Sequence, residues 1–181
     1  MPGPDEGARP ASVPRPRQRK RDLPRDHLGR LRAPGEPDAM AHLKHAQREP
    51  PAAARARDLA RSALAERRFF EAVTYCDLIR KDPVTPEAER PLWRALAQVA
   101  AGLCHLQRGN PGGAQAVLAR AARGLAEHAG AAPGLGAEAV AATVRTLDAQ
   151  LAHGAPVADP PAIVLGEDPA PGSGLPPGER P

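Results

Sequence analysis

The side chains best suited to bind a ligand or to react lie on neighbouring helical patterns in the middle of the chain. His105 and Arg108 are about one helical turn apart, beside Gly109-Asn110, and this pair could hold an anion or a metal ion at a helix junction. Trp93 follows Arg90 by three residues, so both side chains lie on one face of the same helix. The sequence therefore predicts a candidate groove, whose lining residues are Trp93, His105, Arg108, Asp77 and Arg90.

Each of these side chains also has a structural interpretation. His105 can hydrogen-bond across a pair of helices, Arg108 can interact with the last carbonyls of its helix, and Trp93 can fill a core rich in alanine. Cys76 and Cys104 lie on apolar stripes, which predicts buried, unreactive thiols. The sequence leaves the functional and the structural interpretations of the groove open.

Several kinds of chemistry lack the residues that they need. The chain contains neither GxxxxGK[ST] nor GxGxxG, so no phosphate-binding loop is indicated. Ser62 is the only serine between residues 52 and 153, and no histidine and acid accompany it in a triad pattern. The acids near His105 in the chain show no metal-ligand spacing with it, and the two cysteines form no CxxC. We therefore assign no catalytic residue, no metal site and no cofactor.

A tight turn between two antiparallel helices is predicted at Gly109, Asn110 and Gly113. Gly109 tolerates the left-handed backbone that ends a helix, and Asn110, the only asparagine in the chain, can cap the next one. Pro111 suits a first helical turn. We interpret this segment as a structural turn.

Apolar residues recur at helical spacing throughout the middle of the chain, and no strand-like alternation occurs. The pattern predicts an all-α fold, a compact bundle of about five helices; the first three cover about 52–67, 69–81 and 86–108. The fourth follows the turn, and the fifth carries Val140, Val144, Leu147 and Leu151 on one stripe. A further short helix near 39–48 is indicated more weakly.

One helical hairpin resembles a tetratricopeptide repeat. If Gly102 is the glycine at which the helices pack, Ala114, Leu118 and Ala121 fall at the later positions of that repeat. Three clear repeats are absent from the sequence, so the likeness is limited to a hairpin.

Composition divides the chain into three parts. Nine prolines lie in residues 1–50, eight in 154–181 and six between them. We predict a disordered, basic, Pro/Arg-rich leader at 1–51, a helical domain at 52–153, and a disordered, acidic, Pro/Gly-rich tail at 154–181. The apolar island Ile163-Val164-Leu165 is either a clip onto the domain or part of the unstructured tail.

A series of residues in the middle of the chain follows the pattern of one known family. These positions, in order, are Phe70-Glu71-Ala72, Glu89-Arg90, Trp93, Gln98, His105, Arg108-Gly109-Asn110 and Gly113-Ala114. On these residues the chain resembles a small all-helical bacterial and archaeal family, domain of unknown function 309. The resemblance covers about residues 55–127 and, more loosely, the leader around Arg25-Asp26 and Leu28-Gly29-Arg30. The resemblance implies an all-helical fold and names no activity.

The chain departs from that family after Ala72. The family pattern continues with His-Glu, an acid and a tryptophan, whereas this chain has Val73 and Thr74, then Asp77 and Arg80. Valine removes any general base or metal ligand that a histidine would supply. Any chemistry of that pair is therefore lost here.

Function is predicted at the level of class. We expect a non-enzymatic binding or interaction module; the alternatives are an enzyme that uses His105 and Asp77, and a protein that associates with nucleic acid through the basic arm 9–32. That arm carries nine Lys/Arg and two acids, enough for weak, nonspecific phosphate contacts. The partner is otherwise unknown, a protein or a small molecule. Without a signal-peptide pattern or a bilayer-spanning apolar run, we expect a cytoplasmic protein and no membrane partner.

Overall fold

The computed structural model describes residues 22–166, and regular structure in this range is helical apart from one isolated β-bridge between Arg25 and Leu31. The α-helices are α1 (Ala41–Arg48), α2 (Ala53–Ala65), α3 (Phe69–Lys81), α4 (Arg90–Gln107), α5 (Pro111–His128) and α6 (Ala137–Ala152). Short 3-10 turns lie at Glu87–Glu89, Ala129–Ala131 and Pro133–Leu135. The all-α prediction is confirmed. The count of about five is one too low within the described range, because α1 falls in the segment predicted as leader.

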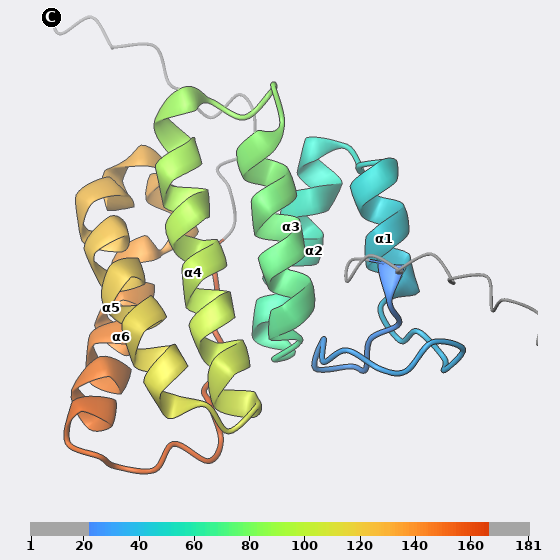
Figure 1. The fold of residues 1–181 in the computed structure, drawn as a ribbon. Coiled ribbons are helices and arrows are strands. Elements are labelled where there is room, and N and C mark those ends of the chain that lie inside the picture. Colours follow the sequence, from blue (N-terminus) through green and yellow to red (C-terminus); the bar gives the residue numbers. More distant parts are fainter. Residues whose placement is uncertain (1–21, 167–181) are drawn as a thin grey trace, which may run out of the picture.

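Helices α2 to α6 pack side by side in chain order (Figure 1). Helix α4 is central, since it packs against both α3 and α5, and its buried stripe includes Trp93, Leu96 and Leu103. Pro83 lies in the turn that follows α3, which is closed by a hydrogen bond from the backbone N–H of Thr85 to the carbonyl of Asp82 at 3.1 Å. Pro91 occupies the first turn of α4, as proline does where no backbone donor is needed.

The backbones of α4 and α5 approach closely at Gly102. A Cβ atom on Gly102 would lie 2.6 Å from Cγ of Leu118 and 3.5 Å from the carbonyl oxygen of Ala114. Glycine at this position therefore allows the two helices to approach this closely.

Residues 22–51 belong to the folded unit, which corrects the predicted leader. Helix α1 rests on α3 at one side of the bundle, and Met40 and Leu43 are buried in the common core (Figure 1). The prediction of disorder failed here because it relied on local composition, whereas the burial of Leu43 depends on contacts with distant residues. Residues 1–21 of the predicted leader lie outside the described residues.

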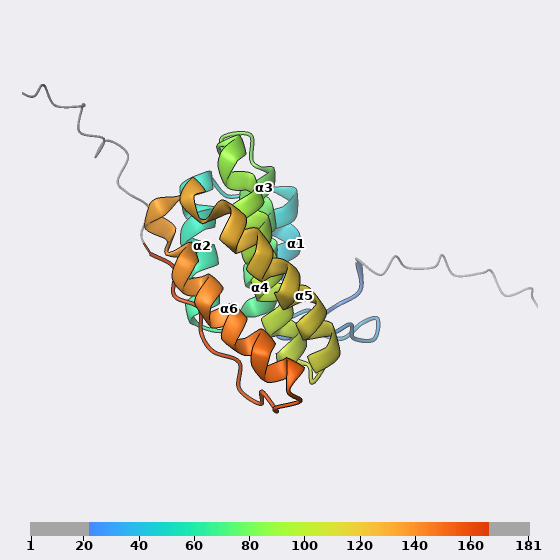
Figure 2. The same ribbon diagram turned by 90° about the vertical axis from the view of Figure 1, so that its left-hand side faces the viewer.

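The start of the predicted tail is also folded. After α6 the chain returns along the bundle, and Ile163 and Leu165 are buried (Figure 2). The backbone N–H of Ile163 donates to the carbonyl of Leu64 at 3.2 Å, and that of Gly166 donates to the carbonyl of Leu135 at 3.1 Å. Residues 154–166 are thus a clip onto the domain; residues 167–181 lie outside the described range.

None of the helices in residues 22–166 combines the length and the apolar character that a bilayer span needs.

Candidate functional site

A cavity of about 670 Å³ opens between α1, α2 and α3. Its apolar lining comes from Pro50, Pro51, Ala52, Ala56, Leu78 and Pro83, and its polar lining from Gln47, Thr74, Asp77, Lys81 and Asp82. Such a mixture of apolar wall and a few polar groups is typical of small-ligand sites. This cavity is the candidate functional site.

Asp77 supplies a fixed negative charge at this site. It accepts hydrogen bonds from Arg80 Nε at 3.1 Å and Arg80 Nη2 at 2.6 Å, and a short one from Lys81 Nζ. Partial burial acts to raise the pKa of Asp77, but the hydrogen bonds from Lys81 and Arg80 outweigh it and lower the pKa below its usual value. Asp77 is therefore ionised at neutral pH.

Thr74 supplies an uncharged polar group on the wall formed by α3. Its side chain is buried, and its hydroxyl lies 3.5 Å from the carbonyl oxygen of Phe70, at the long limit of a hydrogen bond. The hydroxyl can therefore exchange this weak hydrogen bond for one to a ligand at little cost in free energy.

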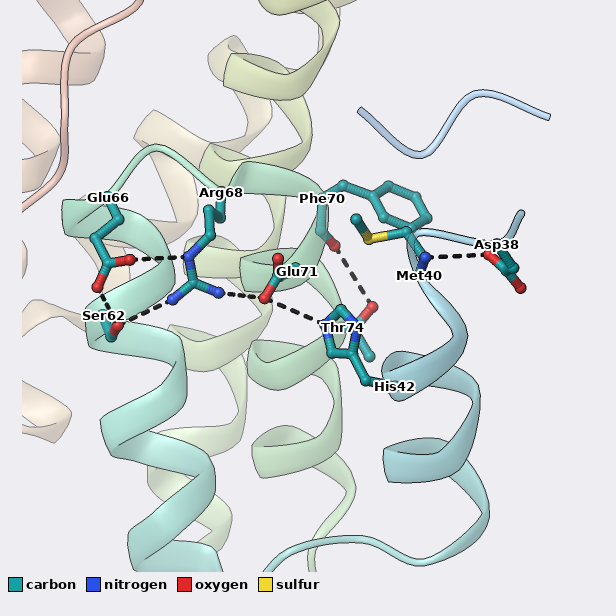
Figure 3. Close-up of polar contacts among 9 residues, drawn as sticks. All are labelled: Asp38, Met40, His42, Ser62, Glu66, Arg68, Phe70, Glu71 and Thr74. Atoms are coloured by element: carbon teal, nitrogen blue, oxygen red, sulfur yellow. Dashed lines mark hydrogen bonds and ion pairs between the residues drawn. The ribbon is translucent and has the colours of Figure 1, made fainter. Parts of the chain in front are cut away.

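A polar network joins α1, α2 and α3 beside this cavity (Figure 3). Arg68 donates to Glu66 Oε2 at 3.0 Å, to Ser62 Oγ at 3.0 Å, and through a short hydrogen bond to Glu71. The same Glu71 carboxylate lies 3.4 Å from Nε2 of His42 on α1. Glu71 is buried, so these two partners compensate the cost of removing its charge from water.

The network is structural rather than reactive. The Ser62 hydroxyl donates to Glu66 at 2.6 Å, and this bond, followed by the one from Arg68, lowers the pKa of Glu66. Burial acts to lower the pKa of Arg68, but its hydrogen bond to Glu66 and the charges of Glu71 and Glu66 raise it overall. Ser62 thus faces a carboxylate that stays ionised, and no histidine activates it.

Trp93 lies inside the bundle and not in a groove. Its side chain is 0% exposed, its Nε1–H donates to Glu89 Oε2 at 3.3 Å, and the guanidinium of Arg57 lies 5.3 Å from the centre of its ring. Arg90, from the same predicted groove, donates to the carbonyl oxygen of Thr85 at 3.2 Å. Both residues therefore stabilise the start of α4.

His105 and Asn110 form the turn between α4 and α5. Nδ1 of His105 lies 3.2 Å from the side-chain nitrogen of Asn110, and Asn110 Oδ1 accepts a hydrogen bond from the backbone N–H of Gly113 at 2.9 Å. Gly109 adopts a φ of 71°, the left-handed conformation expected at a helix end. The structure thus shows the predicted capping by Asn110.

Arg108 anchors the segment that precedes α1. Its Nε donates to the carbonyl oxygen of Leu28 at 2.9 Å, its Nη2 makes a second, short bond to the same oxygen, and its guanidinium lies 5.5 Å from the centre of the Phe70 ring. Gly29, at a φ of 73°, sits directly on that ring, where a Cβ atom would clash. The segment around Gly29 is therefore a turn docked on the domain.

The five residues of the predicted groove are not brought to one surface. Asp77 lines the cavity between α1, α2 and α3; His105 contacts the turn, Arg108 binds the leader, and Trp93 is enclosed near the other end of α4. The sequence indicates only that Trp93 and His105 share one helix. They are twelve residues apart, and at a rise of about 1.5 Å per residue this places them near opposite ends of α4. Only Asp77 belongs to the candidate site.

All the lining residues except Asp77 were missed in the sequence, and Gln47, Pro50 and Pro51 were missed because they lie in the segment predicted as leader. The weakly indicated helix near 39–48 was the one signal that could have placed them on the domain.

Both cysteines are buried free thiols. Burial raises the pKa of Cys76 to about 12, and burial likewise raises the pKa of Cys104. Neither thiol is poised for nucleophilic chemistry. Within residues 22–166, no three His, Cys, Asp or Glu side chains gather as a metal site would require.

The fold and these contacts define a small all-helical domain with a leader and a C-terminal clip docked on it. Residues 58–117 match the family model described as Domain of unknown function (DUF309), so this part of the chain is similar to that family. The match extends from α2 into α5 and includes Trp93, His105, Arg108 and the turn that follows. No curated protein and no solved structure matches the chain.

Proposed function

We propose that the protein is a non-enzymatic binding module that takes a small molecule into the cavity between α1, α2 and α3. The observation that carries the proposal is the cavity itself, about 670 Å³ in volume, with an apolar wall and the polar groups of Thr74 and Asp77 on one helix. Its volume is in the range of small-molecule sites.

The charges of the lining favour a neutral or cationic ligand. Asp77 and Asp82 contribute two carboxylates and Lys81 one ammonium. An anionic ligand would face the carboxylates of Asp77 and Asp82 at short range, whereas an amine could share Asp77 with Lys81 and Arg80. We therefore expect a ligand with an apolar body and a neutral or positively charged polar group.

An enzymatic role receives less support. The pair His105 and Asp77 has separate partners, and His105 is not among the residues that line the cavity of Asp77. General acid–base catalysis needs both groups within hydrogen-bond reach of one substrate.

We also propose that this module acts in the cytoplasm, where free thiols such as Cys76 and Cys104 stay reduced. We further propose that the hairpin of α4 and α5 is tetratricopeptide-like, and the close approach of the two helices at Gly102 supports this.

The test is a saturation-transfer NMR screen of the full chain against a fragment set of aromatic amines, aromatic amides and aromatic acids. Thr74→Leu places a branched side chain against the cavity and removes a hydroxyl. Thr146→Leu is the matched control, because Thr146 is exposed on α6 and makes the same bond to the carbonyl four residues back, at 3.2 Å to Ala142.

We expect amines or amides to bind to the wild-type protein and to Thr146→Leu, and to lose binding in Thr74→Leu. Circular dichroism establishes that each variant is folded. Asp77→Asn, at a partly exposed position, provides a second variant and should reduce the preference for amines over amides. Equal binding by all variants, or binding of the acids alone, would overturn the proposal.

A further inference from the structure

A second hollow lies between α4 and α5, on helices that do not line the first cavity. Its volume is about 220 Å³, several times the roughly 30 Å³ that a water molecule occupies in the liquid, which leaves room for a phosphate group. Its floor includes Ala95 and Gly124, and a Cβ atom on Gly124 would lie 3.0 Å from the Cβ of Ala95. The small residues keep the helices close and leave the hollow unfilled.

Arginines from both helices surround this hollow. Arg94 comes from α4, and Arg120 and Arg123 come from successive turns of one face of α5. All three side chains are exposed. His128 and Glu127 complete this rim, with His128 Nε2 3.8 Å from the Glu127 carboxylate. Three guanidinium groups thus face one carboxylate.

The three arginines have no acidic partner of their own. Within residues 22–166, Arg94, Arg120 and Arg123 make no ion pair, whereas Arg57, Arg68 and Arg80 each bind a carboxylate. Three guanidinium groups gathered around a single carboxylate, that of Glu127, keep an excess of positive charge and repel one another, and an oxyanion between them lowers that repulsion. Arginine is also the side chain that binds phosphate through two parallel N–H donors.

We propose that this hollow between α4 and α5, rimmed by Arg94, Arg120 and Arg123 and called the arginine groove below, binds a phosphate group. The group belongs to a nucleic-acid strand or to a small phosphorylated molecule, and both sources present the same oxygens to the arginines. A chain with a formal net charge of +4 supports such binding at long range. This site is independent of the proposed small-molecule cavity, so either proposal can fail without the other.

The experiment measures binding of two probes to the full chain: fluorescein-labelled oligouridylate by fluorescence anisotropy, and inorganic pyrophosphate by isothermal titration calorimetry. The test variant replaces all three rim arginines: Arg94→Gln, Arg120→Gln and Arg123→Gln. The matched control, Arg48→Gln, Arg55→Gln and Arg145→Gln, removes the same charge from exposed positions outside the groove. Arg120→Glu is a second variant with a single exposed change.

We expect the groove variant to weaken binding of at least one probe by about tenfold or more, and the control to change it by less than about threefold. For the oligonucleotide, the negative slope of log K against log salt should become shallower by about 2 in the groove variant, since each of the three lost contacts to a single strand contributes about 0.7. Binding of oligouridylate alone identifies a strand as the source, and binding of pyrophosphate identifies a small phosphorylated molecule.

Two outcomes would overturn the inference. The first is that neither probe binds to the wild-type protein. The second is that the groove variant, Arg120→Glu and the control weaken binding equally, since that result would assign the affinity to net charge or to the basic arm rather than to the groove.

Discussion

The guanidinium of Arg108 binds a single backbone carbonyl and contacts one aromatic ring. Two of its nitrogens donate to the carbonyl oxygen of Leu28, and its plane lies against Phe70. Both interactions hold the turn that contains Gly29 on the domain. The chemistry of this arginine is thus used within the fold, which is why it is unavailable for the groove predicted from the sequence.

Replacing Arg108 should loosen the docked turn. Arg108→Ala removes charge-assisted hydrogen bonds and a cation–π contact, so we expect the free energy of unfolding to fall by about 2 kcal/mol. The backbone N–H of Gly29 should also exchange faster with deuterated solvent. Urea denaturation and hydrogen exchange measure the two effects.

Arg108→Lys is the control for charge. Lysine keeps the positive charge but lacks the planar fork of donors, so its stability should lie between those of the wild type and Arg108→Ala. An alanine variant as stable as the wild type, with unchanged exchange at Gly29, would show that the turn is held by other contacts.

At the level of helices, the α4–α5 contact depends on the absence of one methyl group. The Cβ atom of Gly102→Ala would lie 2.6 Å from Leu118, so that side chain or the helix must move. The gain in helix propensity offsets only part of this strain, and we expect a net loss of roughly 1–3 kcal/mol in urea denaturation.

Gly112→Ala is the matched control in the same hairpin. A Cβ atom at Gly112 meets no other atom within 4 Å, so this variant should be as stable as the wild type or more stable by up to about 1 kcal/mol. Equal effects of the two substitutions would mean that helix propensity, and not the packing of α4 on α5, decides the outcome.

The C-terminal clip should contribute to stability through one buried side chain. Ile163 is 2% exposed, whereas its neighbour Val164 is 77% exposed. Ile163→Ala should therefore lower the free energy of unfolding by about 2 kcal/mol, and Val164→Ala should leave it nearly unchanged. Matching urea midpoints for the two variants would contradict a docked clip.

Elements with local signals were predictable from the sequence, and elements that depend on distant contacts were not. Pro83 and Gly109-Asn110 end helices by their own backbone preferences, so the C-terminal ends of α3 and α4 followed closely from the sequence, whereas α4 begins at Arg90 and not at 86. The docking of Leu43 and Ile163 depends on partners far away in the chain, and the composition around both favours disorder.

The same distinction applies to the candidate site. Asp77 was predicted because an acid on a helix is visible in the sequence, whereas Gln47, Pro50 and Pro51 became lining residues only through the docking of α1. The groove of Trp93 with His105 and Arg108 failed for a related reason. Sharing a helix does not place side chains at the same end of it.

For the molecule as a whole, three carboxylates with lowered pKa values link the stability of the fold to pH. Burial acts to raise the pKa of Asp38, but hydrogen bonds from Lys44 and from the backbone of Arg25 and Met40 lower it overall. The pKa of Asp77 and that of Glu66 are also lowered by their hydrogen bonds. These groups join the leader to α1 and hold polar contacts around α2 and α3.

A lowered pKa in the folded state means that the unfolded chain binds protons more readily. Each such carboxylate therefore adds stability above its unfolded pKa, 3.8 for Asp38 and Asp77 and 4.5 for Glu66, and this stability is lost as the pH falls through the folded pKa. We expect the urea midpoint to be nearly constant between pH 7 and about pH 5.5 and to fall steeply below about pH 4.

The assignment to these three groups is tested by the triple variant Asp38→Asn, Asp77→Asn and Glu66→Gln. Its urea midpoint at pH 7 should be lower than that of the wild type, and it should change less between pH 7 and pH 3, because groups that cannot ionise cannot lose their charge. The matched control is Glu87→Gln, Glu138→Gln and Asp148→Asn, whose side chains accept no hydrogen bond within residues 22–166. If the control flattens the pH dependence as much as the test variant does, acid destabilisation comes from overall charge. If only the test variant flattens it, acid destabilisation comes from protonation of the hydrogen-bonded carboxylates Asp38, Asp77 and Glu66.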